Sequence, residues 1–141
     1  MHSLSRQDGF TVVELVVVIT VLGILAAFAV PRFVSLEVQA RTAAVQALAS
    51  SLRSSAALSH SLWLSQGEPA SVTMQGQSIV MTNGYPDLAT IDDSLADSSG
   101  FSYAEDTGVF QKIGVGSNCT VTYAAAVAGS APDVTVDVTG C

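Results

Sequence analysis

Basic residues are scarce in this sequence, and acidic residues outnumber them by more than two to one. Lys and Arg total five against twelve Asp and Glu, the formal net charge is −7, and Lys112 is the single basic residue after Arg53. A surface that binds nucleic acid needs clustered Lys and Arg to pair with phosphates. The composition therefore argues against nucleic acid as a partner.

The motifs of common catalytic and cofactor sites are also missing. The sequence has no Gly-rich phosphate-binding loop, no Gly-x-Ser-x-Gly motif and no Cys/His spacing typical of a metal site. Its many serines belong to no motif that pairs a serine with a base, and His2 and His60 are its only histidines. We therefore expect no enzyme activity, no cofactor and no metal ion.

Cysteine is limited to two residues, Cys119 and Cys141, both in the polar part of the chain. An even count there indicates a disulfide formed in an oxidising compartment. Such a bond would close a 23-residue loop. A loop of that size is expected to gain roughly 3 kcal/mol of stability and to hold the chain end in place. A metal site and two free thiols are the alternatives.

One long segment near the start of the chain is apolar and almost free of charged residues. Residues 15–30 contain no charged side chain, and residues 10–13 extend the apolar run towards the N-terminus. About twenty such residues are enough for a helix to span a membrane. Glu14 interrupts the run, and an ionised acid inside a bilayer costs about 2.5–3.5 kcal/mol and usually has a partner. The segment predicts a membrane-spanning helix whose single acid needs a cation.

The stretch before this segment is short and polar, and its charged residues are Arg6 and Asp8. A conventional secretory signal has its apolar segment before the cleavage site. Here the apolar segment follows the small-residue junction between Gly9 and Phe10. Cleavage at that junction would leave the segment on the mature chain. An uncleaved signal anchor is the alternative.

The helical pattern continues beyond the apolar segment. Gly23 and Pro31 are weak points, because glycine is a poor helix former and proline breaks or kinks a helix. The pattern resumes over residues 32–64 and is expected to stop at Gln66 and Gly67. An apolar stripe at helical spacing marks the face that needs cover, formed by Val34, Val38, Val45, Leu48 and Leu52.

Short strands are predicted in the remainder of the chain, at residues 71–74, 78–81, 109–113, 119–123 and 134–138. Residues 75–77 suit a hairpin turn between the first two, and residues 87–96 suit a short helix capped by Asp87. The predicted fold is α+β, with an antiparallel sheet of about four strands on the C-terminal half of a long helix and a C-terminal disulfide loop. The chain is predicted to divide into a leader at residues 1–9, a membrane and assembly helix at 10–31, an amphipathic helix at 32–66 and a β-sheet head at 67–141.

The stretch Gly9-Phe10-Thr11-Val12-Val13-Glu14-Leu15, followed by the apolar run with Gly23 and Pro31 inside it, resembles the processing site and first helix of type IV pilins. The resemblance is close over residues 9–38, and the remainder resembles a type IVa-like prepilin in layout. Gly84-Tyr85-Pro86, Asn118-Cys119 and Thr139-Gly140-Cys141 further resemble major pilins of mannose-sensitive haemagglutinin pili. Pilin leaders are usually more basic than this one.

The resemblance implies a role for each residue of the motif. A prepilin peptidase would cleave after Gly9, and Phe10 would become the N-methylated N-terminus. Glu14 would pair with the Phe10 ammonium of the adjacent subunit and so set the register of assembly. The helix is expected to melt between Gly23 and Pro31 during assembly.

The resemblance also implies partners and a location. The partners would be identical subunits, the prepilin peptidase, the pilus assembly machinery and the inner membrane before assembly, with a surface glycan as a candidate ligand. The prepilin would lie in the bacterial inner membrane and the mature chain in an extracellular pilus used for attachment or biofilm formation. A pseudopilin of a type II secretion system and a signal-anchored binding domain or enzyme are the alternatives.

Three further features of the polar part have modest interpretations. His60 is expected to lie on the surface or to pack, and Trp63 to belong to the core rather than to a ligand platform. The acid-rich stretch at residues 92–106 is interpreted as solvated loop charges, with a calcium site built from carboxylates as the alternative.

Overall fold

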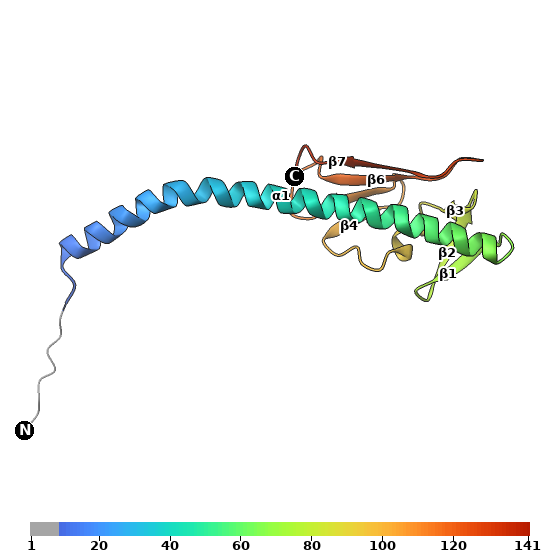
Figure 1. Cartoon of the computed structure of the whole chain (residues 1–141), viewed down its shortest axis with the longest axis horizontal. Helices are drawn as coiled ribbons and strands as arrows, with labels where there is room; N and C mark the ends of the chain where they lie inside the picture. Colours follow the sequence, from blue (N-terminus) through green and yellow to red (C-terminus); the bar gives the residue numbers. More distant parts are fainter. Residues whose placement is uncertain (1–8) are drawn as a thin grey trace, which may run out of the picture. The chain divides into compact units, whose positions relative to one another are not determined.

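The computed structural model describes residues 9–141, so that of the predicted leader only Gly9 is described and the rest lies outside. The chain divides into two compact units, Met1–Glu37 and Val38–Cys141. Within the described residues the helices are α1 (Val12–Ser65) and the short 3-10 helix η1 (Asp92–Ser94) (Figure 1). The strands are β1 (Ser71–Met74), β2 (Gln77–Thr82), β3 (Tyr85–Pro86), β4 (Phe101–Ala104), β5 (Val109–Lys112), β6 (Thr120–Ala124) and β7 (Asp133–Asp137).

In the first unit, α1 is exposed along its whole length, from Val12 to Glu37. Its most apolar 18-residue window has a mean hydropathy of 2.7, and none of that window is buried. By length and composition this helix can cross a membrane. An apolar surface of this kind requires lipid or another protein around it.

The C-terminal end of α1 confirms the predicted stop. The N–H of Gly67 donates to the carbonyl of Leu64 at 3.4 Å, and the N–H of Glu68 donates to that of Trp63 at 2.9 Å. Gly67 has a φ of +79°. This pair of bonds around a left-handed glycine is the Schellman motif, which satisfies the last carbonyls of a helix.

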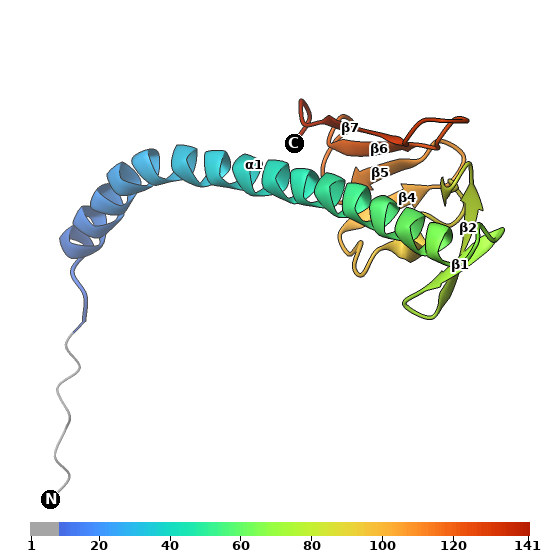
Figure 2. The same ribbon diagram turned by 45° about the vertical axis from the view of Figure 1, so that its right-hand side comes forward.

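In the second unit, α1 packs on an antiparallel sheet with the strand order β4-β5-β6-β7 (Figure 2). Val45, Leu48 and Leu52 from the predicted stripe are buried there, whereas Val34 and Val38 are 56% and 41% exposed. The prediction that the whole stripe belongs to the core is therefore wrong for these two. A strand of five residues is about 17 Å long and covers only about eleven residues of a helix. The part of α1 that belongs to this core therefore runs from Val45 to Ala56.

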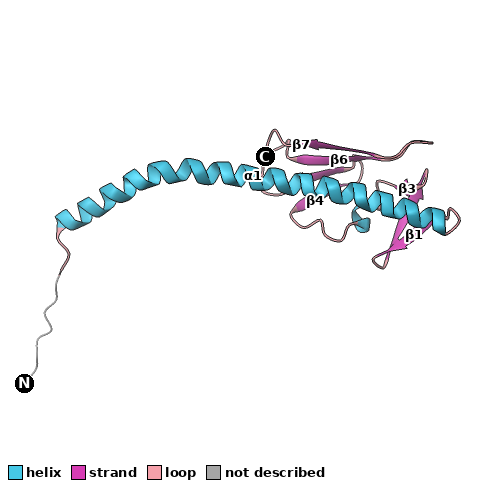
Figure 3. Cartoon of the chain, in the orientation of Figure 1, coloured by secondary structure: helices cyan, strands magenta, loops and turns pink. Residues whose placement is uncertain are grey.

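A second antiparallel sheet contains β1, β2 and β3 in that order (Figure 3). The sequence predicted one sheet of about four strands, but the structure has two sheets and two additional strands, β3 and β4. β1 and β2 are joined at Gln75 and Gly76, which have φ angles of +51° and +83°. Two consecutive positive φ angles define the tight turn of a two-residue hairpin, as predicted for this segment.

The helix predicted for residues 87–96 is shorter than expected. Only Asp92, Asp93 and Ser94 form η1, and Leu95 is extended with a φ of −84° and a ψ of 142°. Asp87 accepts a hydrogen bond from the hydroxyl of Thr90 at 2.9 Å. That side-chain bond favours a turn over a helix because it offers the backbone a local alternative.

Candidate assembly segment and C-terminal disulfide

The start of α1 is fixed by reciprocal hydrogen bonds between Thr11 and Glu14. The backbone N–H and the hydroxyl of Thr11 donate to Oε2 of Glu14 at 2.9 and 2.7 Å. The N–H of Glu14 donates back to the Thr11 hydroxyl at 3.2 Å. This arrangement is a capping box, in which two unsatisfied donors of the first helical turn each find an acceptor.

The predicted cleavage junction lies just before this cap. Gly9 and Phe10 are outside any helix or strand, and both are exposed, Phe10 by 87%. A β-carbon added to Gly9 would meet no atom within 4 Å. Exposed backbone outside regular structure is accessible to a peptidase.

Gly23 and Pro31 both lie inside α1, which stays helical through them. Proline leaves the carbonyl one turn earlier without its N–H partner. The break predicted at these residues concerns the assembled state, and it stays a prediction.

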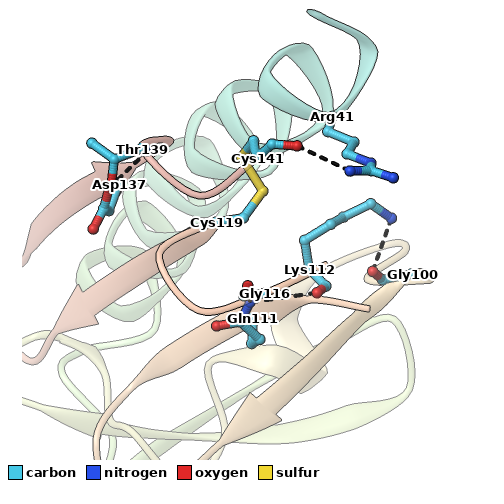
Figure 4. Close-up of a disulfide and its surroundings, with 9 residues drawn as sticks. All are labelled: Arg41, Gly100, Gln111, Lys112, Gly116, Cys119, Asp137, Thr139 and Cys141. Carbon is cyan, nitrogen blue, oxygen red and sulfur yellow. Dashed lines mark hydrogen bonds between the residues drawn. A yellow bond between two sulfur atoms is a disulfide. The ribbon is translucent and has the colours of Figure 1, made fainter. Parts of the chain in front are cut away.

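Cys119 and Cys141 form a disulfide, with an S–S distance of 2.03 Å (Figure 4). Cys119 is fully buried and precedes β6, and Cys141 is 9% exposed. The guanidinium of Arg41 on α1 donates to the carbonyl of Cys141 at 3.1 Å. The bond and this contact attach the segment after β7 both to the sheet and to the helix.

The other two basic residues of the second unit also donate to backbone carbonyls. Arg53 donates to the carbonyl of Val134 on β7 at 2.7 Å. Lys112 donates to the carbonyl of Gly100 at 2.9 Å, and its ammonium lies 4.9 Å from the centre of the Phe101 ring. These cations therefore tie α1 to β7 and β5 to the loop before β4.

His60 and Trp63 take part in a ring stack near the end of α1. The rings of His60 and Tyr85 are 4.4 Å apart and nearly parallel, and those of His60 and Trp63 are 5.6 Å apart. Nδ1 of His60 lies 2.7 Å from the carbonyl of Gly84. Gly84 has a φ of +84°, and a β-carbon there would lie 2.9 Å from the Trp63 ring. The glycine is therefore required both by the turn and by the stack.

In the acid-rich stretch at residues 92–106, one carboxylate bonds within its own loop. Within residues 9–141, no three His, Cys, Asp or Glu side chains come together as a candidate metal cluster. Asp97 accepts a hydrogen bond from the N–H of Ser99 at 2.7 Å. Bonds from the side chain and the backbone of Ser99 hold the pKa of Asp97 below its usual value. Solvated loop charges and a calcium site therefore both remain predictions for this stretch.

Comparison with known proteins identifies the first part of the chain. Residues 4–30 match the family described as the prokaryotic N-terminal methylation motif. The chain is also 53% identical over 53 residues to the type IV narrow pilus major component PilA5 of Thermus thermophilus. The N-terminal part of the chain is therefore similar to that of a type IV pilin. Glu14 and the junction between Gly9 and Phe10 lie inside the matched methylation motif.

The likeness to the Thermus pilin covers 38% of this chain and 46% of that protein, so the chain spans less than half of its relative. No solved structure matches the chain. Neither match is to a pilin of mannose-sensitive haemagglutinin pili, and that resemblance stays a prediction.

Two features of the chain escaped the sequence analysis. The capping role of Thr11 has a clear signal, because Thr followed three residues later by Glu at the start of an apolar run marks a capping box. The contact of Tyr85 with His60 has no such signal, since the two residues lie 25 positions apart in the chain.

Proposed function

We propose that this chain is a structural subunit of a type IV pilus, without catalytic activity, that polymerises through α1. The observation that carries this proposal is the methylation motif at residues 4–30, joined to a helix that is exposed throughout the first unit and holds an apolar window long enough to span a membrane. A helix of this composition is stable in lipid or among copies of itself. It serves in both environments, first in the inner membrane and then inside a filament.

The proposed maturation begins at the open backbone between Gly9 and Phe10. Prepilin peptidase removes residues 1–9, and the new Phe10 amine is N-methylated. Residues 10–31 then form the membrane and assembly helix, residues 32–66 the amphipathic helix, and residues 67–141 the head. The assembly machinery inserts the processed chain at the base of the filament.

Glu14 sets the register of assembly in this proposal. Apolar helices associate with little preference for one stagger, because every offset buries a similar apolar surface. A carboxylate and an ammonium in a medium of low dielectric stabilise each other only when they are close, and an unpaired charge there is costly. The pair between Glu14 and the Phe10 ammonium of the adjacent subunit therefore selects one offset. We propose attachment to surfaces, including surface glycans, and biofilm formation as the uses of the filament.

The experiment that tests this function compares the wild type with Gly9→Leu in a host that has a prepilin peptidase and a pilus assembly system. The leucine side chain blocks the small-residue site, so the variant is expected to keep residues 1–9 and to stay in the membrane. The wild type is expected in the fraction sheared from the cell surface, as filaments in negative-stain micrographs. Wild-type chain that is processed but never sheared off would instead indicate a pseudopilin.

A further inference from the structure

An open pocket of about 220 Å³ lies between α1, β3 and the segment that leads into β7. It is lined by Arg53, Ala56, Ala57, Tyr85, Ala131, Pro132 and Val134. The ring of Tyr85 is backed by His60 at 4.4 Å. The residues that line the pocket are therefore mainly apolar, and Arg53 is the one cationic residue among them.

Arg53 has spare donor capacity in this pocket. A guanidinium has five N–H donors in a planar fork, and the bond to the Val134 carbonyl, at 2.7 Å, comes from its Nη2 atom. That bond fixes the orientation of the fork, and the side chain is otherwise exposed. A guanidinium held in this way is suited to bind a carboxylate through two parallel hydrogen bonds.

The composition of the second unit supplies the complementary charge. From Val38 to the end of the chain there are nine Asp and Glu residues and only three Lys and Arg residues, namely Arg41, Arg53 and Lys112. Neither Arg41 nor Lys112 borders this pocket. In an array of identical subunits, every Arg53 is therefore surrounded by heads that carry an excess of carboxylates.

We propose that the Arg53 pocket is an interface between subunits, in which Arg53 pairs with an Asp or Glu side chain from a second copy of this chain. The inference rests on the proposed function, since it requires packed copies of the head. Covering the apolar walls by a neighbouring head excludes water from the pair, and exclusion of water strengthens it. The occupied pocket holds heads together that would otherwise repel one another through their net negative charge.

Zero-length crosslinking of intact filaments tests this inference, because Lys112 is the only lysine in the sequence. The variant Arg53→Lys with Lys112→Gln places the only lysine at the pocket edge. A carbodiimide joins an amine to a carboxylate in direct contact, forming an amide with loss of water. We expect covalent dimers in denaturing gels, with residue 53 joined to an Asp or Glu of a second chain in fragment mass spectra.

Two controls define the background. Lys112→Gln alone has no lysine, so its dimers come only from the N-terminal amine. Wild-type filaments place the only lysine at Lys112, which also contacts a backbone carbonyl but borders no part of this pocket. Filaments in which residue 53 gives no link above these backgrounds, or links only within one chain, overturn the inference. Failure of the wild type to form any filament counts against the proposed function instead.

The salt dependence of filament stability provides a second test that needs no lysine. Arg53→Gln removes the charge, and Lys112→Gln removes one positive charge elsewhere on the same head. We expect Arg53→Gln to raise the fraction of subunits released by mild heat about two- to fivefold at low salt and to keep most of that effect at high salt, because a pair shielded from water is screened little. Lys112→Gln should act only through repulsion between exposed charges and lose its smaller effect at high salt. Equal release from both variants contradicts the inference. A different result would assign the pocket to a glycan: filaments that give no links at residue 53 but bind glucuronic acid only when Arg53 is present.

Discussion

Glu14 and Thr11 cap the N-terminus of α1 for each other, with both donors of Thr11 on Oε2 of Glu14 at 2.9 and 2.7 Å. The acid in the apolar segment therefore has a local partner within its own chain. Thr11 is uncharged, so the cap satisfies hydrogen bonds without neutralising the carboxylate. Oε1 keeps its capacity to accept from a cation on a second subunit, which the proposed pairing with Phe10 requires.

Replacement of Thr11 by valine removes the hydroxyl and keeps the shape. The Glu14 N–H then loses its acceptor, at a cost of about 1 kcal/mol to the first turn. We expect hydrogen exchange at the Glu14 amide, measured by NMR in detergent micelles, to become about fivefold faster. Thr11→Ser keeps the hydroxyl and should exchange at nearly the wild-type rate. An unchanged rate in Thr11→Val would show that the cap does not hold the helix end.

Glu14→Gln keeps an acceptor for Thr11 and removes the negative charge. If the acid pairs with the Phe10 ammonium of a neighbour, the variant leaves that cation unpaired among apolar helices. We expect filament yield in the sheared fraction to fall by about tenfold or more. Cleavage after Gly9, followed by mass spectrometry of membrane fractions, serves as the control. Normal cleavage with wild-type filament yield would refute the role of Glu14 in registration.

Loss of the disulfide is expected to destabilise the head. The bond joins residues 22 positions apart, and a loop of this size contributes about 3 kcal/mol in the chain-entropy model. Cys119→Ala combined with Cys141→Ala should lower the free energy of unfolding in urea by about 2–4 kcal/mol. A reductant should lower the stability of the wild type to a similar extent and leave the double variant unchanged. A wild type insensitive to reduction would contradict this assignment.

Tyr123 is expected to make the head sensitive to alkali. Its side chain is fully buried, and its hydroxyl donates to the carbonyl of Pro86 at 2.8 Å. Burial raises the pKa of this phenol above its usual value. The folded state thus favours the protonated form. The resulting stability is present below about pH 10, the pKa in the unfolded chain, and is lost as the pH rises further.

The matched variant is Tyr123→Phe, which keeps the ring and loses the hydroxyl. At neutral pH its free energy of unfolding should be lower by about 1 kcal/mol, because the Pro86 carbonyl loses its donor. It should therefore unfold at a lower urea concentration. Its free energy of unfolding should also fall less steeply between pH 9 and pH 11, which a series of urea titrations measures. The same pH slope in both proteins would mean that another group causes the alkaline loss.

Features with a local signal were predicted well from the sequence. The apolar run, the stop at Gly67, the hairpin turn at Gln75 and Gly76 and the Cys119–Cys141 disulfide all match the structure. Each depends on a few neighbouring residues or, for the disulfide, on there being only two cysteines.

Features that depend on tertiary contacts were missed. β3 has only two residues, one of them a proline, so no alternating pattern exists to detect. Val38 has the same helical spacing as Val45 but is exposed, because the sheet covers only a limited length of α1. The Arg53 pocket combines α1 with residues around positions 85 and 132, and only the fold brings these together.

Intact mass of protein sheared from the cell surface tests the central claim most directly. The account predicts a chain that begins at N-methylated Phe10 and is lighter by two hydrogen atoms because of the bond between Cys119 and Cys141. Fragmentation from the N-terminus should place the methyl group on the Phe10 amine. A chain that keeps residues 1–9 and is found only in the membrane would contradict the account and leave the signal-anchored domain in its place.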